Sequence, residues 1–333
     1  MTEELRADIE NLCGDVRWEE PMHSHTTFKI GGPAECFASP SSAEGFISLV
    51  KYCDKKQIPF FIVGNGSNLL VSDSGVRGVV IHAGKAFGKI YLWDGREEWL
   101  GCGLDFTPED RERTIVAVQS GALMSAAAAF ALKHSLAGLE FASGIPGTLG
   151  GGFIMNAGAY DGEISQVCAG SLVYDVGEKQ VLFLNRKEQC FGYRSSIYQE
   201  KEYIVLMGFL GLEKGNPNEI REKINDYTVR RREKQPIDMP SAGSTFKRPR
   251  GAYAAKLIEE CGLKGLTVGG AQVSVKHSGF LVNIGNATCA DVVTLIQLVR
   301  QQVQDKTGYR LEPEVKWIGD EKIDFASGEI SVD

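Results

Sequence analysis

The chain has 333 residues, a formal net charge of −7, 43% hydrophobic residues and 24% charged residues. These values are ordinary for a soluble globular protein of two or three domains, and the negative charge argues against a general binder of nucleic acids or membrane surfaces. The acidic first sixteen residues do not predict a signal peptide, and no run approaches the roughly 18 apolar residues of a membrane span. The eight cysteines have no CxxC or other metal-ligand spacing, and no HExxH occurs. We therefore expect reduced thiols, no metal site and a cytoplasmic protein.

The first predicted elements are a helix and the strand that it leads into. Ser41-x-x-Glu44 is a capping box that precedes apolar residues at helical spacing, so we expect a helix that ends near residue 56. Apolar runs predict strands at 58–63, 76–82, 113–118, 171–176, 181–184 and 203–210. A second helix is expected among these strands, at roughly 123–134. The polar segment 85–112 is interpreted as a surface hairpin excursion without an assigned role.

From about residue 216 the pattern changes to that of a compact α+β domain. A helix from there runs into the basic stretch 230–234, and a short helix at 252–260 and a strand at 280–284 follow. The last long helix begins with the capping box Thr288-x-x-Asp291 and ends before Gly308.

The densest glycine cluster is GIPGTLGGGFIMNAGAY, at 144–160, with six glycines in seventeen residues. Glycine is used where φ is positive or where backbone must approach another group closely. A flexible linker is the alternative, but Ile145, Leu149 and Phe153 are too apolar for one. We therefore interpret this segment as a loop that cradles a cofactor.

A second glycine cluster, GNGSN at 64–68, directly follows an apolar strand. Such a turn offers several backbone N–H groups to an anion, which suits a pyrophosphate. It is not a Rossmann fingerprint, because a third glycine is missing and the residues after Leu69 are typical of a strand. No GxxxxGK[ST] occurs, so a P-loop nucleotidase is excluded.

Seven segments in a fixed order carry a resemblance that covers the chain from about residue 20 to 319. They are His25-TTFKIGGPA, Val63-GNGSNLLVSDSGVRGVVI, GIPGTLGG with MNAGAYDGE, Tyr193-Arg194-Ser195-Ser196, Arg230-RREKQP, Ala242-GSTFKRP and LEPEVKWIG. In these motifs the chain resembles the UDP-N-acetylenolpyruvoylglucosamine reductases (UDP-N-acetylmuramate dehydrogenases, the MurB family). The short spacing from Arg194 to Ser244 is similar to that of the form without an extra lid segment.

The resemblance implies an α+β fold: a two-subdomain FAD-binding fold of the vanillyl-alcohol-oxidase/PCMH type with a C-terminal α+β substrate-binding domain. The expected boundaries are 1–83 and 84–215 for the FAD-binding subdomains, 216–319 for the substrate-binding domain and 320–333 for a tail. Non-covalent FAD would contact Gly64, Asn65, Gly66, Ser67, Asn68, Gly144, Ile145, Pro146, Gly147, Gly150, Gly151 and Asn156.

The implied reaction is the NADPH-dependent reduction of the enolpyruvyl ether of UDP-N-acetylglucosamine to UDP-N-acetylmuramate in peptidoglycan synthesis. NADPH gives a hydride to flavin N5, which passes it to C3 of the substrate. Ser244 matches the proton donor to C2, while Arg194 and Glu314 match the residues that hold and polarise the substrate carboxylate. Arginine suits that place because its fork binds a carboxylate bidentately.

The other expected substrate-binding residues are Tyr160, Arg230, Lys234 and Lys247, with the cations serving the UDP diphosphate. We expect a monomer whose partner is a UDP-sugar, with no nucleic acid and no membrane. The alternative is an FAD-dependent oxidoreductase of the same fold that acts on a small alcohol or acid, which would need neither the diphosphate cations nor the Ser244 proton donor.

Overall fold

The computed structural model describes residues 1–319, 321–323 and 330–332. By packing, the chain forms two compact units, and neither is a single stretch of sequence. Unit 1 comprises residues 1–16, 38–65 and 81–230, and unit 2 comprises 17–37, 66–80 and the described residues from 231 onward. The contiguous domain boundaries expected from the sequence, which follow the binding roles of the segments, stay a prediction. Part of the expected tail at 320–333 lies outside the described residues.

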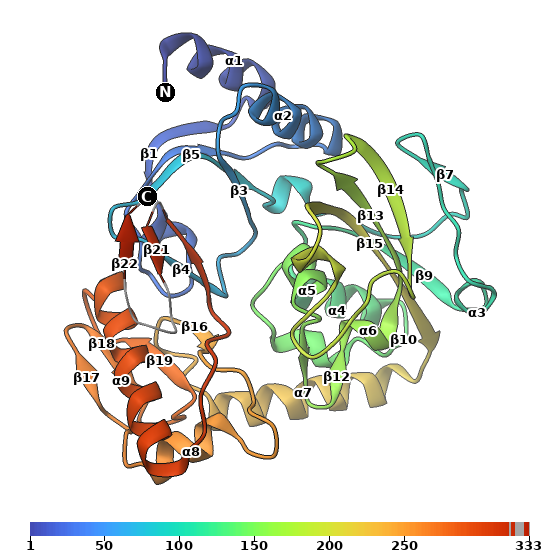
Figure 1. Cartoon of the computed structure of the whole chain (residues 1–333). Coiled ribbons are helices and arrows are strands. Elements are labelled where there is room, and N and C mark those ends of the chain that lie inside the picture. Colours follow the sequence, from blue (N-terminus) through green and yellow to red (C-terminus); the bar gives the residue numbers. More distant parts are fainter. Residues whose placement is uncertain (320, 324–329, 333) are drawn as a thin grey trace. The chain divides into compact units, whose positions relative to one another are not determined.

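Unit 1 is built around one large sheet. Its elements are α1 (Glu3–Cys13), α2 (Ala43–Lys55), β3 (Phe60–Val63), η2 (Lys85–Phe87), β6 (Ile90–Leu92), β7 (Glu98–Trp99), β8 (Cys102–Gly103), α3 (Pro108–Arg111), β9 (Thr114–Gln119), α4 (Met124–Lys133), β10 (Leu136–Ala137), η3 (Glu140–Gly144), α5 (Leu149–Ile154), β11 (Gly158–Ala159), β12 (Gly162–Glu163), α6 (Ile164–Val167), β13 (Cys168–Asp175), β14 (Gln180–Asn185), η4 (Ile197–Gln199), β15 (Tyr203–Lys214) and α7 (Pro217–Lys234), whose last four residues belong to unit 2. The sheet has the order β14-β13-β15-β9-β6, and β10 also pairs with β15 (Figure 1).

Both faces of this sheet are covered, so β15 reads as a continuous apolar run instead of an alternating one. Val205, Leu210 and Leu212 pack with α4, α5 and their neighbours in one core cluster. Met207 and Phe209 belong to a second cluster. The strands expected from the sequence are all present, with ends shifted by a few residues.

The second cluster explains the polar excursion at 85–112. Trp93 packs edge-on against Phe209 with ring centroids 5.1 Å apart, and Phe106 does the same at 5.2 Å. β6 extends the sheet, and a short β7–β8 hairpin follows it. The expectation of a surface excursion without a role was therefore incomplete, because its aromatic side chains cover a sheet face.

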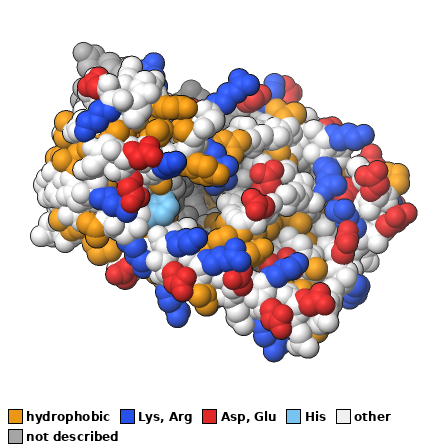
Figure 2. Space-filling model, turned by 90° about the horizontal axis from the view of Figure 1, so that it is seen from below, with side chains coloured by type: hydrophobic (Ala, Val, Ile, Leu, Met, Phe, Trp, Pro, Cys, Tyr) orange, Lys and Arg blue, Asp and Glu red, His pale blue; other side chains and the backbone are white. Residues whose placement is uncertain are grey.

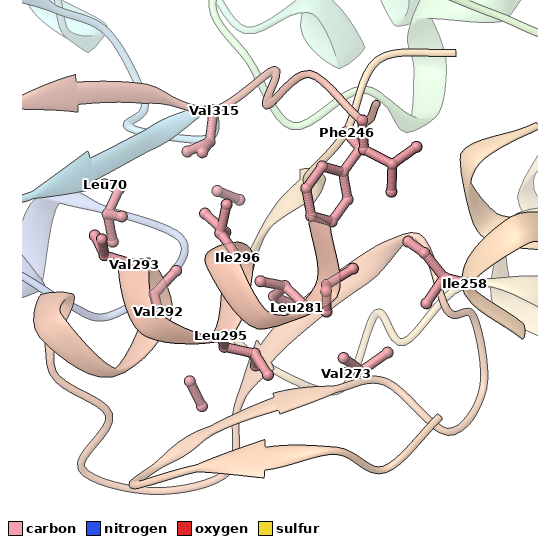
Figure 3. Packing of buried hydrophobic residues seen from close by; sticks show 14 of the residues in the cluster. Leu70, Phe246, Ile258, Val273, Leu281, Val292, Val293, Leu295, Ile296 and Val315 are labelled. Carbon is pink, nitrogen blue, oxygen red and sulfur yellow. The ribbon is translucent and has the colours of Figure 1, made fainter. Parts of the chain in front are cut away.

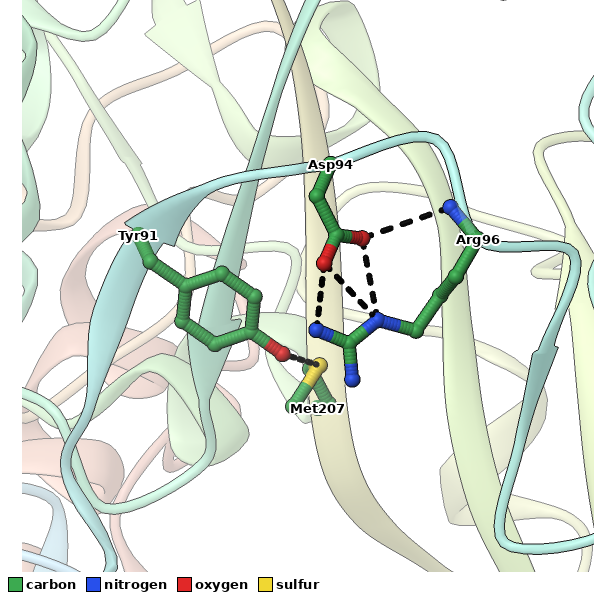
Figure 4. Close-up of polar contacts among 4 residues, drawn as sticks. All are labelled: Tyr91, Asp94, Arg96 and Met207. Atoms are coloured by element: carbon green, nitrogen blue, oxygen red, sulfur yellow. Dashed lines mark hydrogen bonds and ion pairs between the residues drawn. The ribbon is translucent and has the colours of Figure 1, made fainter.

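Polar contacts join this excursion to the sheet and also form within it (Figure 4). The Tyr91 hydroxyl donates to Met207 Sδ at 3.5 Å, and Arg96 pairs with Asp94 through several hydrogen bonds. The Arg96 guanidinium lowers the pKa of the Asp94 carboxyl to about 2. It also lies over the Trp93 ring, 5.3 Å from the centroid.

Unit 2 combines short sheets with two helices. Its elements are β1 (Val16–Pro21, whose first residue belongs to unit 1), η1 (Met22–His25), β2 (Pro33–Ala38, whose last residue belongs to unit 1), β4 (Leu69–Val71), β5 (Val76–His82, whose last two residues belong to unit 1), β16 (Ser241–Ser244), α8 (Ala254–Glu260), β17 (Thr267–Val268), β18 (Ala271–Val273), β19 (Phe280–Asn283), α9 (Cys289–Thr307), β20 (Lys316–Ile318), β21 (Glu321–Ile323) and β22 (Ile330–Val332). β1, β2 and β5 are consecutive neighbours in one sheet, and β16-β19-β18-β17 is the order of another. β20 pairs in parallel with β4, and β21 pairs with β22.

The long helix α9 organises the core of unit 2. The capping box of Thr288 and Asp291 predicted from the sequence is present, and Gly308 ends the helix in the left-handed conformation. Asp73 adds a second cap by accepting from the backbone N–H groups of residues 289 and 290 at 2.7 and 3.0 Å. The other predicted capping box, Ser41 with Glu44, is not formed: Ser42 is the N-cap of α2 and accepts from the Gly45 N–H at 3.1 Å, and a glycine at this position cannot return a side-chain bond.

Apolar side chains of α9 meet those of α8, β18 and β19 in one core cluster (Figure 3). Ile296 and Leu281 lie in this cluster and are fully buried. Because the interior is close-packed, removal of a side chain there leaves a cavity.

Replacing Ile296 by alanine is expected to lower the free energy of unfolding by about 2–5 kcal/mol, through lost burial and the cavity that remains. Urea denaturation followed by circular dichroism measures this. The matched control is Leu298→Ala on the same helix, where the side chain is 40% exposed and the expected loss is below about 1 kcal/mol. Equal losses in the two variants would contradict this core.

Candidate functional site

In unit 1 the two glycine-rich segments lie against each other. A Cβ built on Gly64 would lie 2.1 Å from Thr148 Oγ1, closer than real Cβ atoms come. The Asn65 side-chain amide donates to the Pro146 carbonyl oxygen at 2.6 Å. The sequence expected both segments to serve one cofactor, and the structure brings these parts of them together.

The 144–151 segment is less of a loop than its glycines suggested. Gly144 ends η3 and Leu149 begins α5. The close approach at Gly150 is to protein, since a Cβ there would lie 2.9 Å from Ser120 Cβ. Gly151 is different: it is exposed, and the only atom near a Cβ there is Thr148 Oγ1 at 3.9 Å. No side chain of Gly151 obstructs this exposed surface, so the residues present are compatible with FAD.

Arg194 occupies a strained turn. Residues 192 and 195 exchange backbone hydrogen bonds of 3.0 and 3.3 Å, which makes Tyr193 and Arg194 the tip of a two-residue hairpin. The φ of Arg194 is 54°, in the left-handed region that a non-glycine residue rarely adopts. Its guanidinium donates to the Gly158 carbonyl oxygen at 3.4 Å. Such strain persists where the surroundings hold the backbone, and it is frequent at functional sites.

Tyr160 is also strained, with a φ of 51°, and it contacts helix α7. Its ring stacks on that of Tyr227 with centroids 4.5 Å apart and an interplanar angle of 8°. Its hydroxyl donates to the Tyr227 carbonyl oxygen at 3.2 Å. One turn further along α7, Arg230 pairs with Asp226 at 2.8 Å. In unit 1, Tyr160 therefore lies close to the helix that carries Arg230.

Asn156 is a buried residue whose side chain binds other parts of the chain. The residue is 1% exposed and has a φ of 41°. Its side chain donates to the Gly192 carbonyl oxygen at 3.0 Å and accepts from the Ser165 N–H at 2.9 Å. Both ends of the amide thus bind protein, and its nitrogen supports the Arg194 hairpin at Gly192.

In unit 2, backbone contacts hold residues 66–68, the remainder of the glycine-rich turn at 64–68. A Cβ on Gly66 would lie 2.1 Å from the His25 carbonyl oxygen, and its φ is 61°. The Thr27 N–H donates to the Gly66 carbonyl oxygen at 3.2 Å. Ser67 follows in this turn, and strand β4 begins directly after Asn68, as expected for a turn that is not a Rossmann fingerprint.

The segments that carry Ser244 and Glu314 pair with each other in unit 2. The Glu314 N–H donates to the Thr245 carbonyl oxygen at 2.8 Å, and the Lys247 N–H donates to the Glu312 carbonyl oxygen at 2.9 Å. The Asn68 side-chain amide donates to the Glu314 carbonyl oxygen at 3.2 Å, and the Lys316 N–H donates to the Asn68 carbonyl oxygen. Three sequence motifs separated by up to 246 residues thus meet at one place.

The side chains at this junction are mostly charged or polar. Ser244 is exposed, and its hydroxyl donates over a long 3.4 Å to the Phe246 carbonyl oxygen. Lys247 forms an ion pair with Glu312, while Lys234 ends α7 as an exposed residue.

Lys316 was missed by the sequence analysis. Partial desolvation and then the nearby Lys247 lower the pKa of its amine, although the side chain keeps contact with solvent. Glu312 and, to a smaller extent, Glu314 partly offset this lowering of the pKa. The alternation of Glu314 and Lys316 beside the buried Val315 was the available signal.

Two further properties concern the whole described chain. No helix among the described residues is long and apolar enough to cross a membrane, and they contain no group of three or more His, Cys, Asp or Glu residues suited to a metal ion. On the face shown in Figure 2, basic and acidic side chains are interspersed.

Comparison with known proteins assigns the family. A model of the FAD binding domain matches residues 34–179, and a model of the UDP-N-acetylenolpyruvoylglucosamine reductase C-terminal domain matches 235–318. The chain is 48% identical to the UDP-N-acetylenolpyruvoylglucosamine reductase of Caldanaerobacter subterraneus subsp. tengcongensis, over 92% of this chain and 95% of that protein. The chain belongs to the UDP-N-acetylenolpyruvoylglucosamine reductase family.

Other members of this reductase family support the assignment. The Clostridium novyi reductase is 45% identical over 90% of this chain and 91% of its own length. The crystal structure of the reductase from Thermus caldophilus matches with a TM-score of 0.71 and 31% identity, over 91% of this chain and 98% of that one. The predicted family and the α+β fold with an FAD-binding domain are confirmed, and so is the prediction of an FAD-containing oxidoreductase.

The left-handed φ of Arg194 leads to a stability prediction. Arg194→Gly and Arg194→Ala both remove the guanidinium, but glycine adopts this φ without steric cost. We expect the glycine variant to be more stable than the alanine variant by up to about 1 kcal/mol, measured by urea denaturation. Ser195, whose φ is not positive, is the control, and there alanine should be at least as stable as glycine. The same order at both positions would contradict the strained turn.

Proposed function

We propose that the protein reduces the enolpyruvyl ether of UDP-N-acetylglucosamine to UDP-N-acetylmuramate with NADPH, in peptidoglycan precursor synthesis in the cytoplasm. The observation that carries the proposal is the junction in unit 2, where backbone hydrogen bonds pair the segments of Ser244 and Glu314 beside Asn68. The names of the related reductases indicate the same substrate. A monomeric state remains a prediction.

The FAD-binding residues proposed are those of the two glycine-rich segments. The turn at 64–68 would offer N–H groups to the pyrophosphate, and the exposed backbone at Pro146 and Gly151 would contact the flat ring. Bound FAD supplies hydride-transfer chemistry between the nicotinamide and C3 of the substrate. Asn156 serves in this proposal through the hairpin that its side chain supports.

Ser244 is the proposed proton donor to C2. Addition of a hydride at C3 places negative charge on C2, next to the substrate carboxylate. A serine hydroxyl is a weak acid, so it donates a proton only where such charge develops beside it. Its long hydrogen bond to the Phe246 carbonyl leaves this hydroxyl weakly committed within the protein.

Arg194 and Glu314 are proposed to bind and polarise the substrate carboxylate. The Arg194 guanidinium can form a bidentate pair with it, and its long 3.4 Å contact with Gly158 is weak by comparison. Two carboxylates placed close together favour sharing a proton. Glu314 would therefore share a proton with the substrate or pair with a cation during the reaction.

The diphosphate is proposed to bind Arg230, Lys234 and Lys247, and Tyr160 is proposed as a further substrate-binding residue. Arg230 and Lys234 are four residues apart on α7, which places them on the same face of the helix. The exposed ion pair of Arg230 with Asp226 has little intrinsic stability. A phosphate group could therefore recruit this guanidinium at small cost.

The function is tested by following the flavin absorbance of purified protein without oxygen. NADPH should bleach the yellow protein, and the UDP-sugar enolpyruvyl ether should restore the colour. Ser244→Ala should still bind FAD and be bleached by NADPH, but recolouring should slow by about 10²-fold or more, the scale of lost acid catalysis.

Ser241→Ala, at the other end of β16, is the control and should behave like the wild type. Fast recolouring of Ser244→Ala would exclude Ser244 as the proton donor. Bleaching without recolouring of the wild type would favour an oxidoreductase of small alcohols or acids. A colourless protein that binds no added FAD would contradict the proposal as a whole.

Arg230→Ala together with Lys234→Ala should raise the KM for the UDP-sugar more than it lowers kcat, because these cations bind a part of the substrate that does not react. Steady-state kinetics measures both constants. Arg221→Ala and Lys223→Ala on the first half of α7 remove the same charge and should leave KM within about twofold. A KM unchanged by the first pair would remove both residues from the diphosphate site.

A further inference from the structure

The Arg194 hairpin is attached to the end of α5 by the side chain of Gln199. The Gln199 amide nitrogen donates to the Arg194 carbonyl oxygen at 3.0 Å and to the Ile154 carbonyl oxygen at 2.8 Å. An amide –NH₂ has two hydrogens, enough for both carbonyls, and the same nitrogen also lies 4.0 Å from Met155 Sδ. A single side chain thus joins the peptide of Arg194 to the segment that follows the glycines of α5.

Neighbouring bonds hold the two segments on either side of this link. Ser196 Oγ donates to the same Ile154 carbonyl oxygen at 2.7 Å, and the buried Asn156 amide donates to the Gly192 carbonyl oxygen at 3.0 Å. Three side chains therefore connect 154–156 with 192–199. Among them, Gln199 bonds directly to the Arg194 peptide.

The base of the hairpin is anchored separately to the sheet. The fully buried Gln189 side chain donates to Ser171 Oγ on β13 at 3.1 Å and to the Leu184 carbonyl oxygen at 2.9 Å. The Ile197 N–H donates to the Gln189 carbonyl oxygen at 2.9 Å. Because this network holds the hairpin without Gln199, loss of the Gln199 amide should leave the fold intact and free only the tip.

Gln199 itself is exposed, yet its side chain is held in one conformation by two carbonyl oxygens. Ordering a long exposed side chain opposes folding through lost entropy, so stability alone does not account for it. Its hydrogen-bond partners give a reason, because one of them is the backbone carbonyl of Arg194, whose φ lies in the left-handed region. That φ must be maintained for the Arg194 guanidinium to keep its direction.

We propose that Gln199 is a positioning residue that sets the direction of the Arg194 guanidinium relative to the segment at 154–156. The inference rests on the proposed function, in which Arg194 binds the substrate carboxylate. A misplacement of about 1 Å in a group that orients a substrate costs up to about 10²-fold in rate. Gln199 acts on the step that uses the enolpyruvyl substrate and not on the reduction of the protein by NADPH.

The test uses stopped-flow absorbance on the FAD-loaded full chain, with the two half-reactions measured separately. Gln199→Met keeps the length of the side chain and lacks the amide. It should slow reoxidation by the enolpyruvyl substrate by about 10-fold or more, while bleaching by NADPH stays within about twofold. Gln199→Glu, which lacks the donor hydrogens and faces two carbonyls, should slow reoxidation at least as much. Gln301→Met is the control, since it removes another exposed amide bond, to Asp305, and should change neither half-reaction.

A double-mutant cycle separates positioning from general support. In an Arg194→Ala background, Gln199→Met should slow reoxidation no further, because there is no guanidinium left to direct. Reoxidation of Gln199→Met at the wild-type rate overturns the inference, as does equal slowing of both half-reactions or a full effect in the Arg194→Ala background. Wild-type reoxidation by Arg194→Ala alone overturns the role proposed for Arg194, and with it this inference.

Discussion

Close backbone approach at the turn after β3 constrains the candidate site residues in both units. In unit 1 a Cβ at Gly64 would lie 2.1 Å from Thr148 Oγ1, and in unit 2 a Cβ at Gly66 would lie 2.1 Å from the His25 carbonyl oxygen. The contact at Gly66 is with backbone and cannot be relieved without moving the turn, and the positive φ there adds a second reason for glycine. The hydrogen bonds of Asn65 and Asn68 depend on a turn that only glycine allows.

From this turn, one side-chain and one backbone hydrogen bond lead to the segment of the proposed proton donor in unit 2. Asn68 bonds to the Glu314 carbonyl, and the Glu314 N–H bonds to the Thr245 carbonyl, next to Ser244. The alignment of these two segments is set by their backbone pairing together with the Asn68 side chain. Since a shift of one residue turns every side chain to the opposite face, the register decides whether Ser244 and Glu314 serve one substrate.

Motifs and local patterns predicted much of this arrangement, and the parts they missed depend on long-range contacts. The family followed from seven ordered motifs, and α9 from its capping box and apolar spacing, because both are local in sequence. The strain at Arg194 gave no sequence signal, since nothing local distinguishes an arginine with a positive φ. The Asn156 amide bonds to carbonyl and N–H groups 36 and 9 residues away, which no local pattern indicates. Similarly, the polar residues around Trp93 concealed an aromatic cluster that forms only against Phe209.

The division of the chain into interleaved units has a consequence for its folding during synthesis on the ribosome. The chain passes between the units at five points, after residues 16, 37, 65, 80 and 230, so neither unit can be completed from a continuous piece of nascent chain. Strand β4 pairs with β20, about 250 residues later, and at about 5–20 residues per second its partner emerges roughly 12–50 s after it. During that delay the backbone of β4 lacks its native strand partner, and the Leu70 side chain lacks part of its core cluster. Truncated chains should accordingly be unusually dependent on chaperones.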